Sequence, residues 1–518
     1  MIVTLCRDLE QLGLDLKALG EFFSKCDPQI EVRVKAGPCD RPERWLGRSG
    51  TPADRLVFGL CAAGEHGELR ARARRRGFDP LAIEVVDLGA LRALAPAGAA
   101  ATRAARKLLG AALARARAYQ TAGPENFKPV FDANQNVVRR SLFGLPPMRW
   151  KVVPSIRREA CAAERGCRTC ATTCPHTALA HVDGRMVLDK AQCTSCGACV
   201  SACPVAAIDL PGASAAQVEA QLRALLVPDD GSSGPGILFH CQRCTPSLDR
   251  LPQVEYAVDW FPVELPCLGM VSPAWILQSL GMGAAAVGLF PCRREKCRFG
   301  ERETLGQRVD YCQTVLQAVG ASPDALRMMD TTDETTLADV LRRPLAPTAR
   351  VSSMDRAGIE LRPDRGGVAN ALLAMVRAHG KMPEQAIEHA GSPLGVVTLR
   401  PGCTACGSCA SACPSGALVC EHDGTDVAIA FDGTRCIGCG VCAPACPEKV
   451  VHVERKTDLA VLAQGRQTLH REQTVRCERC GGMVITRALA GRLQAILGDD
   501  PVLPALTRYC ETCRALSL

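Results

Sequence analysis

Two runs of cysteines near the C-terminal end of the chain have the spacing of iron–sulfur ligands. Each run reads C-x2-C-x2-C-x3-C and is followed by a proline, Pro414 in the first run and Pro447 in the second. Two-residue gaps let a tight loop direct three thiolates at one [4Fe–4S] cube, and the fourth cysteine ligates the neighbouring cube. A zinc site or a disulfide framework is the alternative, but zinc rarely takes four cysteines from such a run. The predicted ligand sets are Cys403, Cys406, Cys409 and Cys446 for one cube, and Cys436, Cys439, Cys442 and Cys413 for the other.

A second doubled motif lies in residues 158–210. One half keeps the full spacing and ends before Pro204, whereas in the other half the first gap is five residues and Glu164 stands where the usual ligand would be. A longer loop can still bring the first cysteine to its cube, and a three-iron cluster there is the alternative. This motif and the one in residues 401–455 resemble the 2[4Fe–4S] modules of bacterial ferredoxins. The predicted sets are Cys161, Cys167, Cys170 and Cys203 for one cube, and Cys193, Cys196, Cys199 and Cys174 for the other.

Residues 236–345 place cysteines directly after short apolar runs. Gly236–Phe239, Val263–Leu265 and Ala285–Phe290 are predicted strands, and one or two cysteines follow each of them. Ligand sites in open α/β sheets collect beyond the carboxyl ends of strands, so we expect these thiols to meet at one edge of a sheet. Five thiols exceed the four that a cluster needs, which leaves one spare or exchangeable. The predicted set is Cys241, Cys244, Cys267, Cys292 and Cys297.

The same stretch resembles the delta subunit of methyl-viologen-reducing hydrogenase. The resemblance is carried by FHCQRC and by VELPCLGMVSPAWILQSLGMGAAAVGLFPCRREKCRFGER. That family binds a [2Fe–2S] cluster and passes electrons to heterodisulfide reductase, so the resemblance implies such a cluster on these five cysteines. Cys312, on the helix that follows, and Cys420, further along the chain, are expected to be core residues.

Residues 1–95 predict a small α/β domain with cysteines at strand ends. Four short apolar runs in this stretch are predicted strands, and a cysteine follows three of them. The carboxyl ends of such strands share one edge of a sheet, so the three thiols can meet there. Three ordinary buried cysteines are the alternative. The thiols are those of Cys6, Cys39 and Cys61.

This N-terminal domain resembles that of the A subunit of heterodisulfide reductase. The matching pieces are VTLCRDL, VKAGPCDRP and VFGLCAAGEHGELRARARRRGFDPLAIEVVDL. The resemblance implies an iron–sulfur cluster with Cys6, Cys39 and Cys61 as ligands. Asp8 occupies the position of the family's second cysteine, which makes Cys26 a candidate fourth ligand. The family's glycine-rich flavin-binding segment does not follow, so no FAD site is expected.

Two C-x2-C pairs lie near the end of the chain, on either side of a predicted helix at Met483–Leu497. This pattern is typical of a tetrahedral four-thiolate zinc site. A fifth iron–sulfur cube is the alternative. The ligands would be Cys477, Cys480, Cys510 and Cys513.

A chain of 518 residues predicts about three or four domains. We expect a multidomain fold of the α/β and α+β classes, with small α/β cluster-binding domains and two ferredoxin-like modules. Outside the domains described above, residues 96–157 are expected to be a helix and a connector, and residues 346–400 a linker and a helix. Residues 470–518 are the predicted metal-binding tail.

The composition favours a reduced, metal-loaded protein. The chain has 31 cysteines, and a charge at Arg7 argues against a signal peptide, so we expect a cytoplasmic protein and not a secreted disulfide scaffold. The uncharged run Leu265–Cys292 is broken by proline and glycine, which predicts loop, helix and buried strand and no membrane span. The net charge of +8 is modest. The arginines at residues 70–76 predict a solvated helix face, with a docking patch for an acidic partner as the alternative and no nucleic-acid binding.

The sequence contains iron–sulfur cluster motifs but no recognisable catalytic motif, which indicates electron transfer. No nucleophile–base motif, phosphate loop or open metal site appears, so no catalytic residue is predicted, whereas paired clusters hold and pass single electrons. We expect an electron-transfer subunit of an oxidoreductase complex of the heterodisulfide reductase, hydrogenase or formate dehydrogenase type. Its partners would be a flavoprotein or hydrogenase and an acceptor module. A cluster-dependent disulfide reductase, a redox sensor and an all-zinc scaffold are the alternatives.

Overall fold

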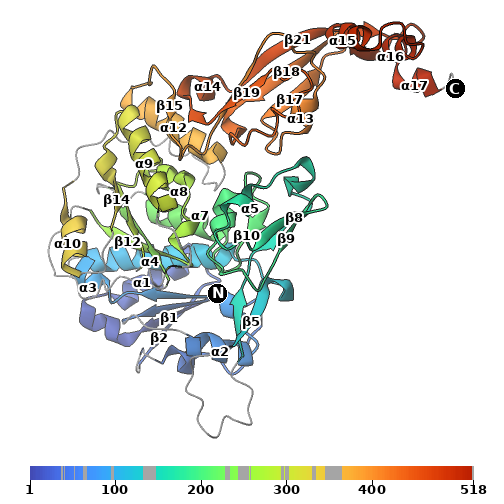
Figure 1. Ribbon diagram of the computed structural model, residues 1–518. Helices are drawn as coiled ribbons and strands as arrows, with labels where there is room; N and C mark the ends of the chain where they lie inside the picture. Colours follow the sequence, from blue (N-terminus) through green and yellow to red (C-terminus); the bar gives the residue numbers. More distant parts are fainter. Residues whose placement is uncertain are drawn as a thin grey trace.

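The mixed α/β multidomain architecture predicted from the sequence is confirmed. The described part of the computed structural model contains two parallel four-stranded sheets, two cysteine-rich units and a C-terminal tail (Figure 1). The structure describes residues 1–36, 39, 41–51, 53–61, 67–94, 98–131, 148–227, 234–242, 256, 258–292, 297, 303–329, 334–344 and 365–515.

The N-terminal sheet is parallel throughout and has the strand order β2-β1-β3-β4. Its central strands β1 and β3 are almost entirely buried, as their continuous apolar runs predict. The long helix α4 packs on β3 and β4. The elements are β1 (Ile2–Cys6), α1 (Leu16–Cys26), β2 (Glu31–Lys35), β3 (Leu56–Leu60), α2 (Gly67–Arg75), β4 (Ile83–Asp87), α3 (Leu91–Leu94) and α4 (Ala99–Ala118).

The second parallel sheet has the equivalent strand order β12-β11-β13-β14. Every residue of α8 is buried, because α9, α12 and β13 pack around this helix. The uncharged run Leu265–Cys292 is thus a turn, a buried helix and a buried strand, as predicted. Within the described residues, no helix has the length and apolar character needed to cross a membrane. The elements are β11 (Gly236–Cys241), β12 (Trp260–Leu265), α8 (Pro273–Gly281), β13 (Ala286–Phe290), α9 (Glu303–Ala318), β14 (Leu326–Met328), α10 (Glu334–Arg342) and α12 (Arg365–His379).

The first cysteine-rich unit, in residues 148–210, is built from short strand pairs and single-turn helices. The preceding stretch, predicted to be a connector, contains the antiparallel pair β5–β6. Lys128 on β5 donates from Nζ to the carbonyl oxygens of Lys190 (2.7 Å) and Cys193 (2.6 Å), so this pair supports a cysteine loop. The elements are β5 (Phe127–Phe131), β6 (Met148–Val152), β7 (Ser155–Ile156), α5 (Thr169–Thr173), β8 (Leu179–Val182), β9 (Arg185–Leu188), α6 (Ala198–Ala202), β10 (Ile208–Asp209) and α7 (Ala215–Leu226).

The second cysteine-rich unit, in residues 394–476, is organised on the antiparallel sheet β17-β18-β21-β22. Strand β21 pairs with β18, so this sheet continues past residue 455, the predicted end of the module. The helix predicted from Met483 begins only at Arg487, because the preceding residues pair with β21 as β22. The elements are β15 (Ile387–Glu388), β16 (Val396–Leu399), α13 (Ser408–Ser411), β17 (Leu418–His422), β18 (Asp426–Asp432), β19 (Val451–Glu454), β20 (Lys456–Thr457), α14 (Leu459–Gln464), β21 (Arg466–Arg476), β22 (Met483–Thr486), α15 (Arg487–Leu497), α16 (Leu503–Arg508) and α17 (Glu511–Ala515).

Helices join these parts of the molecule to one another. Helix α4 lies along α7, and its Arg115 donates to Glu84 Oε1 (3.2 Å) in the N-terminal sheet and to the Gly212 carbonyl oxygen (2.7 Å) beyond the first unit. Helix α12 packs on both α8 and α14, so it links the second parallel sheet to the second unit. In Figure 1 the N-terminal sheet (blue) and the second unit (orange to red) lie at opposite ends of the molecule, and α15–α17 extend beyond the second unit.

Candidate metal centres

The cysteines of the second unit surround two separate cavities. Cys413 leaves its own run and lines one cavity with the cysteines of the second run, while Cys446 lines the other with those of the first run. Apolar side chains such as Ile437 and Ile429 complete the walls of the two cavities. This is the crossed grouping that the spacing predicts. The inner cavity is lined by Cys413, Cys436, Cys439 and Cys442, and the outer cavity by Cys403, Cys406, Cys409 and Cys446.

The chemistry of these donors fits an iron–sulfur cube. Burial, with added repulsion from neighbouring thiolates, raises the pKa of Cys409 and of Cys442 to about 12. Four bare thiolates in an apolar cavity are unfavourable, whereas iron replaces their protons and offsets their negative charge. The backbone N–H of Ala405 donates to Cys403 Sγ at 3.4 Å, and such bonds tune cluster potentials. The residues present therefore fit [4Fe–4S] clusters.

The irregular half of the first unit brings its distant first cysteine to the others. Burial raises the pKa of Cys170 to about 12, and the thiolates of Cys203, Cys167 and Cys161 add to this shift, so these sulfurs are neighbours. A 3-10 turn takes up the longer gap and leaves Glu164 exposed. The structure therefore assembles the predicted Cys161 group, with Glu164 outside it. This group consists of Cys161, Cys167, Cys170 and Cys203.

The regular half of the first unit forms a second set of neighbours. Burial raises the pKa of Cys196, and the Cys174 and Cys193 thiolates contribute to the shift. Burial likewise raises the pKa of Cys199 well above its ordinary value, with contributions from Cys196 and from Cys170 of the other group. The two groups of this unit are therefore adjacent. We refer to Cys174, Cys193, Cys196 and Cys199 as the Cys193 group.

The carboxyl edge of the second parallel sheet collects four described thiols. Cys241 ends β11, Cys267 follows β12, and Cys292 and Cys297 follow β13. Interactions with Cys241 and Cys297, together with burial, raise the pKa of Cys267. Burial and the same two thiols raise the pKa of Cys292 to about 12. We refer to these four as the sheet-edge group, while Cys244, the fifth predicted ligand, lies outside the described residues.

Three N-terminal thiols meet at the carboxyl edge of the first sheet. The sulfur atoms of Cys6, Cys39 and Cys61 lie within 4.8 Å of one another, and Cys6 and Cys61 are 3.7 Å apart. The candidate fourth ligand Cys26 is wrongly placed for this site. It is an exposed residue at the end of α1, which leads into the start of β2, so it lies toward the opposite edge of the sheet. Asp8 is also exposed.

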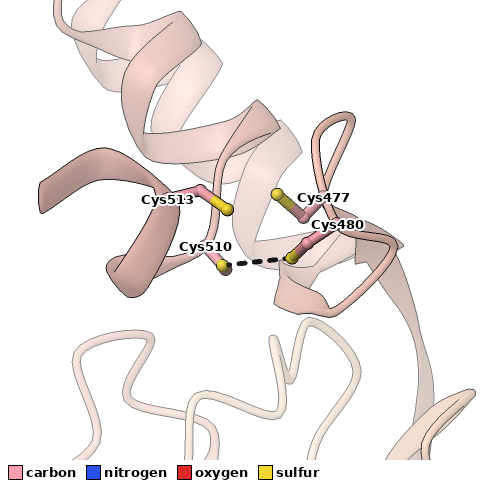
Figure 2. A group of neighbouring side chains, drawn as sticks. All are labelled: Cys477, Cys480, Cys510 and Cys513. Atoms are coloured by element: carbon pink, nitrogen blue, oxygen red, sulfur yellow. Dashed lines mark hydrogen bonds between the residues drawn. The ribbon is translucent and has the colours of Figure 1, made fainter. Parts of the chain in front are cut away.

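The four cysteines of the tail converge more tightly than those of the cavities. All four sulfur atoms lie within 4.8 Å of one another, and Cys480 and Cys510 are 3.6 Å apart. Figure 2 shows one pair on the loop before β22 and the other around the start of α17, with the sulfur atoms directed into the space between them. Backbone N–H groups, first that of Cys510, lower the pKa of the Cys477 thiol to about 6. This tail group consists of Cys477, Cys480, Cys510 and Cys513.

The sheet-edge group lies against the Cys193 group of the first unit. Cys196 and Cys267 belong to one small buried cluster, and Cys297 packs on it. Gly197 permits the close approach, because a Cβ atom at this position would lie 2.8 Å from Met270 Sδ, and its φ of 76° also favours glycine. Thiols from two different parts of the chain are therefore in contact at this interface.

The Cys161 group of the first unit faces the inner cavity of the second unit. Burial raises the pKa of Cys439, and the thiolates of Cys413 and Cys167 contribute to the shift. Arg165 donates from a guanidinium nitrogen to the Cys413 carbonyl oxygen at 3.3 Å. Within the second unit, Cys409 of the outer cavity and Cys442 of the inner cavity are also electrostatic neighbours. The cysteine groups therefore form an unbroken series from the sheet edge to the outer cavity.

Cys420 packs against the core of the second unit, as the sequence predicts, although it is only half-buried on β17. Burial raises its pKa, and the thiolates of Cys406 and Cys403 contribute to the shift. A Cβ atom at Gly407 would lie 3.3 Å from Cys420 Sγ, which places the thiol beside the outer-cavity loop. No spacing rule marks this residue, whereas Cys312 is fully buried in α9, as predicted.

Comparisons with known proteins identify three segments of the chain. Residues 236–343 match the family described as methyl-viologen-reducing hydrogenase, delta subunit. Residues 402–451 match the 4Fe-4S dicluster domain, and residues 186–209 match the 4Fe-4S binding domain. These matches confirm the delta-subunit resemblance and the 4Fe-4S character of both cysteine-rich units.

The chain is also similar to the A subunit of ferredoxin:CoB-CoM heterodisulfide reductase from Methanosarcina mazei. The two are 29% identical over 170 residues, which is 32% of this chain and 21% of that protein. The chain thus covers about a fifth of the length of this relative. Together with the segment matches, this makes the chain an iron–sulfur electron-transfer protein related to hydrogenase delta subunits and, distantly, to the A subunit of heterodisulfide reductase.

Proposed function

We propose that the chain is the electron-transfer subunit of a redox complex and relays single electrons through five clusters in a defined order. The order is the sheet-edge [2Fe–2S] cluster, the Cys193 cube, the Cys161 cube, the inner-cavity cube and the outer-cavity cube. A flavoprotein or hydrogenase-type partner would bind at one end. A heterodisulfide-reductase-like or formate-dehydrogenase-like acceptor module would bind at the other.

The observation that carries this proposal is the proximity of thiols that belong to neighbouring centres. Cys196 and Cys267 share one buried cluster, and Cys167 acts electrostatically on Cys439. Because electron tunnelling falls steeply with distance, clusters held by such residues would exchange electrons directly. The fusion of these modules in one chain would fix an order of centres that separate subunits otherwise reach by docking.

The ends of the series support the assignment of partner sites. Cys406 of the outer cavity is exposed, and Cys297 of the sheet-edge group is half-buried. Clusters held at these positions would be accessible to another protein, as would the inner-cavity cube, because its ligand Cys439 is also exposed. We place the partner sites at the sheet edge and the outer cavity because these are the two ends of the series.

The test is the metal content and redox activity of protein purified without oxygen. Four cubes and one two-iron centre require about eighteen irons per chain, and an N-terminal cluster would add to this number. Reduction by an artificial donor should produce several cluster signals in EPR spectra, and oxidation should remove them reversibly. Fewer than about ten irons per chain would contradict the relay.

A second candidate function, a cluster-dependent disulfide reductase, is favoured by the N-terminal group. Cys6, Cys39 and Cys61 offer three thiols, and among the described residues no fourth cysteine joins them. An iron held by these three thiolates would keep one coordination position open to a sulfur atom of a disulfide substrate, and the clusters of the relay would supply the electrons. Disulfide turnover by the purified chain with an artificial donor alone would support this function. Its absence, in protein whose clusters are fully reduced, would leave electron transfer as the sole role.

A further inference from the structure

The tail group stands apart from the relay in its geometry, its surroundings and its neighbours. We propose that Cys477, Cys480, Cys510 and Cys513 hold a single zinc ion that folds residues 477–515 and fastens them beside the outer cavity. The proposal is independent of the relay, because the cubes of the two units would be held by other cysteines.

The distances between the sulfur atoms fit one ion and not a cube. A tetrahedral zinc ion with Zn–S bonds of about 2.3 Å places its four sulfur atoms about 3.8 Å apart. In the tail group all four sulfur atoms lie within 4.8 Å of one another, and the Cys480–Cys510 distance is 3.6 Å. A cube carries a metal at each of four corners, so its ligands must stand around a larger space, as they do around the two cavities of the second unit.

The backbone positions the two C-x2-C pairs to close on one ion. In the first pair, the Cys477 N–H donates to the Gly482 carbonyl oxygen (2.7 Å) and the Gly481 N–H to the Cys477 carbonyl oxygen (2.9 Å), which folds a tight turn. Gly481 has a φ of 71°, a conformation that favours glycine. The Glu478 N–H donates to the Arg508 carbonyl oxygen at 3.1 Å and so ties the first loop to the second.

The tail has too little apolar core to hold itself together. In residues 477–515 the buried side chains are those of Cys477, Thr486, Leu503 and Cys513, and two of these four are proposed ligands. Helix α15 buries none of its residues, and Ile496 is 62% exposed. Small segments with so little buried apolar surface depend on metals or disulfides for folding, and structural zinc supplies that free energy.

Zinc fits this position better than a redox-active iron. The four sulfur atoms of the tail group lie close to one another, and among the described residues no thiol of another centre joins them. At the sheet edge, in contrast, Cys267 shares a buried cluster with Cys196 of the next centre. An ion without redox chemistry needs no such neighbour.

Two contacts fasten the tail to the outer cavity. Thr486 donates from Oγ1 to the carbonyl oxygen of Thr404 at 2.6 Å, and Thr404 lines the cavity. Arg492 on α15 pairs with Glu448 at 3.1 Å, and Glu448 lines the same cavity. A zinc ion that holds β22 and α15 in place therefore also holds a wall of the outer cavity.

Metal analysis of the full chain tests the identity of the ion. We expect one zinc per chain, with a zinc X-ray absorption spectrum that shows four sulfur neighbours at about 2.3 Å. The variants Cys480→Ser and Cys513→Ser should lose this zinc and keep the iron of the wild-type chain. Cys26→Ser, which alters an exposed thiol outside the proposed centres, should keep both metals. Iron in the tail, seen as a ferric EPR signal or a cube signal that Cys480→Ser removes, would overturn the proposal, as would protein without zinc.

Limited proteolysis of the native protein tests the structural role. Chelation of the zinc should make residues 477–515 sensitive to protease, while the EPR signals of the cubes in the first unit persist. Re-addition of zinc alone should restore protection. A tail that stays protected after the zinc has been removed would overturn the proposed role.

Discussion

The second cysteine-rich unit and the tail that follows it use the same C-x2-C spacing around different spaces. In the unit, four thiols and several apolar side chains line each of the two cavities. In the tail, four thiols converge within 4.8 Å. The C-x2-C spacing determines only the local turn that holds two cysteines. The distance to the chain segment that carries the other cysteines therefore determines how large a metal centre fits between them. The number of metal atoms at a cysteine site is therefore a property of the tertiary packing.

The second unit and the tail also differ in the side chains that surround their cysteines. The cavity walls include apolar side chains such as Ile437 and Leu399, and thiols of the next centre lie nearby. The tail has almost no buried apolar side chains, and its thiols interact with one another. The cavities are suited to clusters that exchange electrons inside a folded unit. The tail is suited to an ion whose binding stabilises its folded state.

Among the changes that test this comparison, loss of one cavity ligand should have the largest effect on metal content. In Cys442→Ser a hydroxyl replaces a buried thiol of the inner cavity, so the variant should lose one cube, about four irons per chain. Cys513→Ser should lose zinc and no iron. Iron and zinc analysis of the two variants after anaerobic purification measures both effects. Equal iron in Cys442→Ser and the wild-type chain would contradict the assignment of this cavity.

Loss of the contact between the units should slow the relay without removing metal. Arg165→Ala removes the guanidinium that bonds to the Cys413 carbonyl oxygen, so the Cys161 group and the inner cavity should separate more readily. We expect full iron content and several-fold slower equilibration of electrons between the units, followed by rapid-freeze EPR. Arg168→Ala, at an exposed position on the same loop, should leave the rate unchanged. An unchanged rate in Arg165→Ala would show that this contact does not hold the two centres together.

Loss of the tail's buried cap should loosen the tail and leave the cubes intact. Thr486 Oγ1 accepts from the Leu489 N–H at the start of α15 and donates to the Thr404 carbonyl oxygen. Thr486→Ala should therefore make local opening of α15 easier by about 1–2 kcal/mol, measured by hydrogen exchange. Thr507→Ala, which removes a hydroxyl bond inside α16, is the matched control. Equal exchange in α15 of both variants would argue against the docking contact.

The smallest effect is expected at Cys420. Its thiol lies beside the outer-cavity loop, and Cys406 and Cys403 contribute to its raised pKa. Cys420→Ala should keep all the iron and shift the potential of the outer-cavity cluster by less than about 60 mV, a tenfold change for a one-electron couple. Cys26→Ala serves as the control. Loss of four irons from Cys420→Ala would instead identify this residue as a ligand.

Local sequence spacing predicts the groups whose members lie on one or two short loops. The crossed sets of the second unit follow from two C-x2-C-x2-C-x3-C runs, and the sheet-edge group follows from cysteines at parallel strand ends. The same edge rule argues against Cys26 as a ligand. A helix that returns to the next parallel strand ends at the amino edge, opposite the edge at which Cys6 and Cys61 lie.

Contacts between separate units cannot be predicted from local cysteine spacing. The approach of Met270 to Gly197 and the bond from Arg165 to Cys413 depend on surfaces that are distant in the chain. For the same reason the sequence does not distinguish one ion from a cube in the tail. That distinction depends on how closely the Cys510 pair reaches the Cys477 pair.

The most direct test of the relay is pulsed EPR of the anaerobically purified chain in its reduced state. We expect magnetic interactions between neighbouring clusters, including one between the first and second units that Arg165→Ala weakens. Clusters that are present but magnetically isolated from one another, or a chain that cannot be reversibly reduced, would contradict the relay.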